Sequence, residues 1–170
     1  MLNLAGTERK LQADELIVSK TDLTGRITYA NDVFLDIADY KLKDVLNEPH
    51  SVIRHDMMPR CVFQLLWEKL QAGEEMFAYV VNATKYGDYY WVYAHVTPSV
   101  NSEGEVTSYH SNRRSPSPEA IEVISSLYET LLKEERSHKN RKDGQKAGYA
   151  LLNKILEEKG VSYDEFVISL

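Results

Sequence analysis

The residues best suited to chemistry lie in one segment near the middle of the chain, from Glu48 to Leu70. Two histidines, His50 and His55, flank Arg54 there. A guanidinium group between two imidazoles can meet an anionic or redox-active small molecule through charge-assisted hydrogen bonds. Pairing of Arg54 with a nearby carboxylate, with the histidines closing the loop, is the more common role of such residues. The segment is therefore a candidate binding loop with two possible roles.

Motifs for catalysis are absent from the sequence. It has no Gly-rich phosphate loop, no metal-ligand cluster at an established spacing, no nucleophile elbow and no paired acid and base. The single cysteine, Cys61, cannot form an internal disulfide, and it falls in an apolar helical pattern where a buried thiol is far commoner than a reactive one. The sequence therefore predicts a binding protein and not an enzyme.

Length and charge narrow the class of protein further. A chain of 170 residues is expected to form one domain with a tail. Its net charge of −6 opposes binding to nucleic acid or to an anionic membrane surface. No signal peptide and no apolar stretch of bilayer-spanning length is present, which predicts a soluble, cytoplasmic protein without membrane insertion.

Hydrophobic periodicity and turn residues predict the elements. Strands are expected at residues 15–22, 26–30, 75–85, 89–97 and 106–112, helices at 32–38, 42–46 and 59–73, and a helix-permitting segment at 7–13. Asn31 is placed to cap a helix, Pro59 suits a first helical turn, Gly73 ends that helix, and Pro98 is expected to end a strand. The helix from Pro59 has one apolar face, made of Phe63, Leu66, Trp67 and Leu70.

The two central strands have faces of different size. One face collects Phe77, Tyr79, Val81, Tyr89, Trp91, Tyr93 and His95, and the other collects Met76, Ala78, Val80, Asn82, Tyr90, Val92, Ala94 and Val96. Small residues beneath helices leave a volume that a ligand can fill. Asn82 is a candidate ligand contact there, unless it reaches water or closes the next turn. We expect the aromatic face to be covered by the terminal helix or by a second subunit.

The last third of the chain is helical. Helices are expected at 119–135 and 149–159, with a capping box from Ser162 to Glu165 before a last apolar turn. The basic residues from Arg136 to Lys146 are expected to form a solvated linker, or alternatively a polyanion site. The predicted organisation is an N-terminal cap segment at 1–14, a sensor domain at 15–114 and a helical extension at 115–170.

This order of elements is that of a PAS domain, and several segments resemble the PAS sensor of bacterial aerotaxis receptors. They are SKTDLTGRITYAND from Ser19, Pro49-His50 with Ile53-Arg54-His55, Pro59 with Trp67, and YGDYYWV from Tyr86. The resemblance covers roughly Ile17 to Arg113, and Leu127-Tyr128 also has a counterpart just after the PAS domain of those receptors. It implies an α+β fold with a five-stranded antiparallel sheet, helices on one face, and a helical C-terminal tail.

The resemblance also implies a cofactor, because that family binds FAD noncovalently and reports its redox state to a chemotaxis module. It implies flavin-binding roles for Arg54, His55 and Asn82, pocket-supporting roles for His50 and Asn31, and a pocket-wall role for Trp67. The chain has Met57 and Met76 where the family carries an Asp and a Trp. Methionine can pack against a flavin ring, but it lacks the acceptor that Asp offers.

Four functions follow as hypotheses. The first is a cytoplasmic FAD-binding redox sensor, the separate PAS half of a bipartite energy-taxis pair, which signals to a membrane-bound chemotaxis transducer and forms a homodimer through its aromatic sheet face. The second is a PAS module without cofactor that only dimerises or docks. The third is a haem-binding PAS sensor; a small flavoenzyme has the least support.

Overall fold

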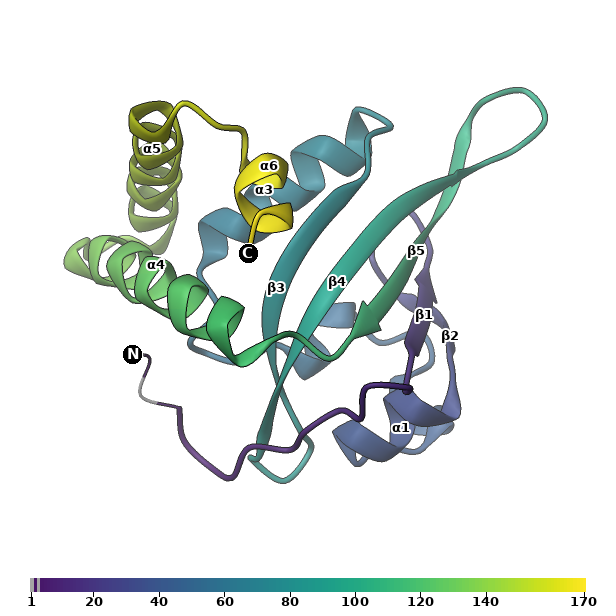
Figure 1. The fold of residues 1–170 in the computed structure, drawn as a ribbon. Helices are drawn as coiled ribbons and strands as arrows, with labels where there is room; N and C mark the ends of the chain where they lie inside the picture. The colour runs from purple at the N-terminus through teal and green to yellow at the C-terminus, as the bar shows by residue number, and fades with distance from the viewer. Residues whose placement is uncertain (1, 3) are drawn as a thin grey trace.

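The protein, described at residue 2 and residues 4–170 by a computed structural model, is an α+β fold built on a five-stranded antiparallel sheet (Figure 1). The strands are β1 (Ile17–Thr21), β2 (Ile27–Ala30), β3 (Met76–Ala83), β4 (Tyr89–Val100) and β5 (Val106–Arg114), in the order β2-β1-β5-β4-β3. Between β2 and β3 lie α1 (Asp32–Ala38), α2 (Leu42–Val45), the 3-10 helix η1 (His50–Ile53) and α3 (Arg60–Gln71). After β5 come α4 (Pro118–Ser137), α5 (Arg141–Lys159) and α6 (Tyr163–Ile168). The predicted fold class is confirmed.

Local signals place the short elements. The Asn31 side chain accepts a hydrogen bond from the Phe34 N–H (3.1 Å), as an N-cap does, and α1 begins at the next residue. Helix α3 ends before Gly73, whose φ of 79° suits a residue without a side chain. The predicted helices at 32–38 and 59–73 are therefore confirmed in type and nearly in length.

The C-terminal helices cover the outer edge of β3, the last strand of the sheet (Figure 1). The Tyr128 hydroxyl of α4 donates to the backbone carbonyl of Tyr79 (2.6 Å), and the Asp164 carboxylate of α6 accepts from the backbone N–H of Phe77 (3.3 Å). An unpaired strand edge invites pairing with another chain. Helices α4 and α6 thus satisfy polar groups that the sheet alone leaves open.

The aromatic sheet face is divided by this arrangement. Trp91 is buried in the same hydrophobic cluster as α4, and its ring stacks with that of Tyr128 at a centroid distance of 6.3 Å. Phe77, Tyr93 and His95 stay partly exposed, with the Phe77 and His95 rings stacked 4.1 Å apart. Of the two expected covers, the chain's own terminal helices account for the Trp91 side.

Three local predictions are wrong. Strand β4 continues through Pro98 to Val100. Strand β3 begins only at Met76, which pairs with Val96, so no β3 residue lies opposite Pro98 to require its missing N–H. Helix α5 already begins at Arg141, so only residues 138–140 separate the two long helices. Residues 7–13 form no helix, and this segment instead lies beside the start of β4 through a Glu8–Tyr89 bridge.

Candidate functional site

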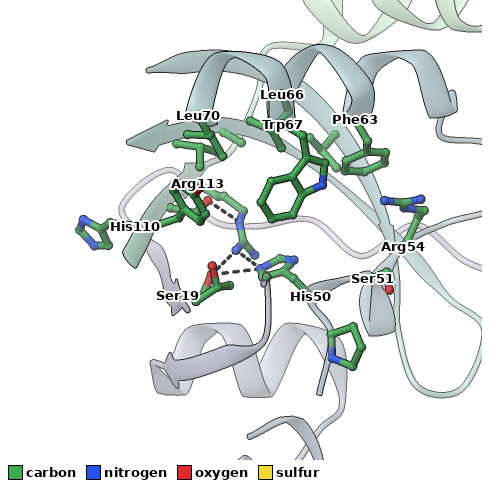
Figure 2. A pocket seen from close by; sticks show the side chains of 18 of the residues that line it. Ser19, His50, Ser51, Arg54, Phe63, Leu66, Trp67, Leu70, His110 and Arg113 are labelled. Atoms are coloured by element: carbon green, nitrogen blue, oxygen red, sulfur yellow. Dashed lines mark hydrogen bonds between the residues drawn. The ribbon is translucent and has the colours of Figure 1, made fainter. Parts of the chain in front are cut away.

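A cavity of about 250 Å³ lies between α3 and the small-residue face of the sheet (Figure 2). It is close to the lower end of the ~300 to 1,000 Å³ typical of small-molecule sites. Its walls are supplied by β1 and its following turn (Ser19, Thr21, Thr24, Gly25), by the segment before α3 (Pro49, His50, Ser51, Arg54), by α3 (Phe63, Leu66, Trp67, Leu70) and by β3 to β5 (Val80, Asn82, Ala94, Val96, Tyr109, His110, Ser111, Arg113).

The apolar wall of the cavity is held by α3. Trp67 packs edge-on against Tyr109 of β5 at a centroid distance of 5.6 Å. It also lies close to Gly25, where an added Cβ would lie 3.0 Å from the indole ring, so the turn after β1 approaches the tryptophan closely. The indole is therefore fixed from two sides and presents a flat surface to the cavity.

The opposite wall contains a buried cation that no carboxylate of residues 2 and 4–170 pairs with. Arg113 is 3 % exposed. Its Nη2 donates to the Ser19 hydroxyl and to His50 Nε2 (2.7 Å), and its Nε donates to the Ser111 hydroxyl (3.0 Å). Nη1 is buried and has no hydrogen-bond partner among the described residues. Burial lowers the pKa of Arg113 to about 10, because desolvation disfavours the charged form of the guanidinium.

This arrangement fixes the state of His50. A guanidinium can only donate, so His50 Nε2 must accept, and the imidazole is neutral with its proton on Nδ1. Burial first, and the charge of Arg113 second, lower the pKa of His50 to about 3. The accessible part of His50 faces the cavity. Figure 2 shows Ser19, His50 and Arg113 as one hydrogen-bonded group beneath Trp67.

Arg54 and Asn82 form a second polar group at the cavity. They face each other in an isolated β-bridge, and the Arg54 guanidinium lies 3.7 Å from the centre of the Phe63 ring. Arg54 Nε and the Asn82 side-chain nitrogen are buried without a well-aligned hydrogen bond in the described part of the chain, and so is the hydroxyl of Tyr90, opposite Asn82. The Tyr90 hydroxyl interacts with Asn82 and does not line the cavity. Buried polar groups rarely stay unsatisfied, so the Arg54 and Asn82 atoms are the ones that indicate a ligand.

Comparison of the sequence with known proteins identifies the family to which this fold belongs. A family model described as PAS fold matches residues 27–113. This chain belongs to the PAS family. The aerotaxis receptor of Escherichia coli (strain K12) is 38% identical over 121 residues, which are 71% of this chain and 24% of the receptor. The nitrogen fixation regulatory protein of Klebsiella pneumoniae is 30% identical over 97 residues, 57% of this chain and 20% of that protein.

Solved structures share the PAS fold. A light-oxygen-voltage domain studied with a flavin analogue gives a TM-score of 0.60 at 19% identity, covering 68% of this chain and 88% of that one. The light-state LOV domain of the blue-light photoreceptor Aureochrome1 gives a TM-score of 0.58 at 19% identity, covering 65% and 88%. At this identity the likeness supports the fold alone. The chain spans a quarter or less of the length of the curated relatives named above.

Four of the eight residues proposed from sequence line the cavity of the PAS domain: His50, Arg54, Trp67 and Asn82. The other four lie outside it. His55 is buried, with its Nδ1 accepting from the Met57 N–H (3.1 Å), and Met57 Sδ accepts from Arg136 Nη2 (3.2 Å). Met76 is fully buried in the core, and Asn31 joins β1 to α1 by accepting from the Val18 N–H (3.0 Å).

Sequence reasoning missed the contribution of the outer strands. Ser19 and Thr21 of β1 and Tyr109, Ser111 and Arg113 of β5 all line the cavity. They alternate in each strand, and Ser19 pairs with Ser111 while Thr21 pairs with Tyr109. The period-two rule that separated the faces of the central strands would have placed these residues on the small-residue face.

The cavity of the PAS domain is electrostatically one-sided. Among the described residues that line it, none is acidic, whereas Arg54 and Arg113 both reach it. Within residues 2 and 4–170, no cluster of three His, Cys, Asp or Glu side chains could hold a metal ion. Over the same residues, none of the helices has the length and apolar character needed to cross a membrane. The arrangement suits a flat, uncharged or anionic organic ligand.

Proposed function

We propose that this PAS domain is a redox sensor that binds FAD noncovalently in the cavity beneath α3. The flavin ring would be held by Trp67 and the other apolar residues of α3 on one side, and by the small residues of β3 and β4 on the other. A flavin supplies a ring that gains electrons and negative charge on reduction. The relatives support this choice, since one is an aerotaxis receptor and another is a nitrogen fixation regulatory protein.

The observation that carries the proposal is the buried Arg113, whose Nη1 has no partner in the described part of the chain, beside a cavity whose described lining has no acidic residue. An uncompensated buried cation is costly unless a ligand supplies acceptors or negative charge. Arg54 Nε and the Asn82 side-chain nitrogen add two more buried donors without a well-aligned hydrogen bond among the described residues. Three such donors would match the acceptor-rich edge of a flavin ring. A cavity of about 250 Å³ would hold the ring, and the remainder of FAD would extend outside it.

FAD uptake by the purified protein tests the proposal. Wild-type protein is expected to take up one FAD per chain, with a flavin absorption band that dithionite bleaches. Arg113→Met removes the buried cation and should weaken binding by about tenfold or more, the effect of losing one hydrogen bond from a charged donor. Arg114→Met is the matched control, because its side chain is exposed. A Soret band would instead indicate haem.

We also propose the partner and location. The domain would act in the cytoplasm and signal to a membrane-bound chemotaxis transducer, with residues 1–14, 15–114 and 115–170 serving as cap segment, sensor and helical extension.

A homodimer would use the part of the aromatic face that α4 leaves partly exposed, at Phe77 and Tyr93. Light scattering should then give twice the chain mass, and Tyr93→Glu should return it to the mass of one chain. A monomeric wild-type protein would remove the dimer.

A further inference from the structure

Helix α3, the wall of the cavity, is capped by a residue from the C-terminal extension. The chain enters α3 through Pro59, which makes no side-chain capping bond. Glu135 of α4 takes this role: Oε2 accepts from the Arg60 N–H (3.1 Å) and Oε1 from the Cys61 N–H (2.8 Å). A carboxylate at this position satisfies free amides and complements the positive end of the helix dipole.

Helix α5 encloses this contact. Glu135 is 8 % exposed. An added Cβ at Gly144 would lie 2.1 Å from the Glu135 carbonyl oxygen, and one at Gly148 would lie 2.7 Å from Glu135 Cγ. Both distances are too short for real atoms, so α5 can pass this close only because it has glycine at these two positions. Helices α3, α4 and α5 therefore meet at one side chain.

The same region of α4 also contacts the loop that precedes α3, at Asp56 and Met57. Arg136 Nη2 donates to the Asp56 carbonyl (3.3 Å) and to Met57 Sδ (3.2 Å), two and three residues after Arg54. Burial first, and then Arg60, lower the pKa of Arg54, and the charge of Glu135 partly offsets this. Adjacent residues of α4 thus hold both structures that frame Arg54, the loop and the first turn of α3.

We propose that Glu135 is a positioning residue that couples the cavity to the α4–α5 helical hairpin. A change of ligand or charge beside Arg54 and Phe63 moves the start of α3. Because Glu135 is bound to that first turn and enclosed by α5, the hairpin responds to the change. The proposal deepens the proposed function, since it makes the C-terminal extension the element that reports the state of the cavity.

Hydrogen–deuterium exchange of the full chain, with and without FAD, tests the coupling. Glu135→Gln keeps the shape of the side chain but points a donor at one of the two amides. In wild-type protein, FAD is expected to slow exchange over residues 141–159. In Glu135→Gln, FAD still binds, but this response falls by about tenfold, the effect of losing one charge-assisted hydrogen bond. Glu122→Gln, an exposed change on the same helix, should respond like wild type.

Two further variants keep the test decisive. Gly148→Ala displaces Glu135 from the α5 side and should also weaken the response. An unchanged response to FAD in both Glu135→Gln and Gly148→Ala would overturn the coupling. If wild-type protein takes up no FAD, the proposed function fails, and the coupling is then tested without ligand. Arg54→Gln should change hydrogen–deuterium exchange in α5 when Glu135 is present, and should not change it when combined with Glu135→Gln. Additive effects of Arg54→Gln and Glu135→Gln would overturn it.

Discussion

The neutral His50 predicts how the ligand-free protein responds to acid. Its pKa is about 3 in the folded state, against an ordinary value of 6.5. The unfolded chain therefore binds one more proton than the folded chain between these two values, and stability must fall as pH drops through this window. The contribution is fully present above pH ~6.5 and lost progressively toward pH ~3.

The magnitude follows from the size of this window. Each pH unit below ~6.5 costs about 1.4 kcal/mol, so lowering the pH from 7 to 5 should cost about 2 kcal/mol from His50 alone. For a chain of this size, that corresponds to a fall in Tm of about 4 to 8 °C. Burial also lowers the pKa of His55 and of His110, so they act in the same direction and only a variant isolates His50.

Urea denaturation at pH 7, 6 and 5 measures the effect. His50→Gln keeps an oxygen that can accept from Arg113 but has no titratable group, so its free energy of unfolding should fall less steeply with acid, by about 1.4 kcal/mol per unit. His138→Gln is the matched control, because His138 pairs with Glu134 at an exposed site. Parallel pH profiles for wild type and His50→Gln would refute the buried, neutral imidazole.

Two other variants test the fold and the cavity separately. Tyr128→Phe removes the buried hydrogen bond to the Tyr79 carbonyl and should cost about 1 to 3 kcal/mol in urea denaturation, whereas Tyr149→Phe, whose hydroxyl binds an exposed carboxylate, should cost about 0.5 kcal/mol or less; equal costs would contradict the closing of β3 by α4. Asn82→Leu replaces a buried amide, whose nitrogen lacks a well-aligned hydrogen bond, with an apolar side chain of similar shape, so we expect the ligand-free protein to lose about 1 kcal/mol or less and its FAD affinity to fall about tenfold. An unchanged FAD affinity would remove Asn82 from the site.

Local sequence signals were enough to predict the elements that form the PAS scaffold. The cap at Asn31, the apolar stripe of α3 and the turns between strands act within a few residues, so their patterns are readable from the chain. The basic residues from Arg141 begin a helix and not the expected linker, because their local pattern does not distinguish the two. They are solvated in either state, and α5 forms there because it packs against Glu135 and α4.

The site could be predicted only where one segment supplies it. Arg54, His50 and Trp67 lie within 18 residues of each other, and all three line the cavity. Arg113 joins them only through the pairing of β5 with β1, which follows from the fold. Glu135 lies 74 residues from the amide of Cys61 that it binds, so no spacing rule could connect them.

The central claim is that the cavity beneath α3 holds a redox-active flavin. Titration of ligand-free protein with FAD, followed by flavin fluorescence and by absorbance before and after dithionite, tests it most directly. The account predicts saturation at about one FAD per chain, competition by riboflavin, and full bleaching and reoxidation of the bound flavin. A protein that is purified colourless and shows no saturable binding of FAD would contradict it.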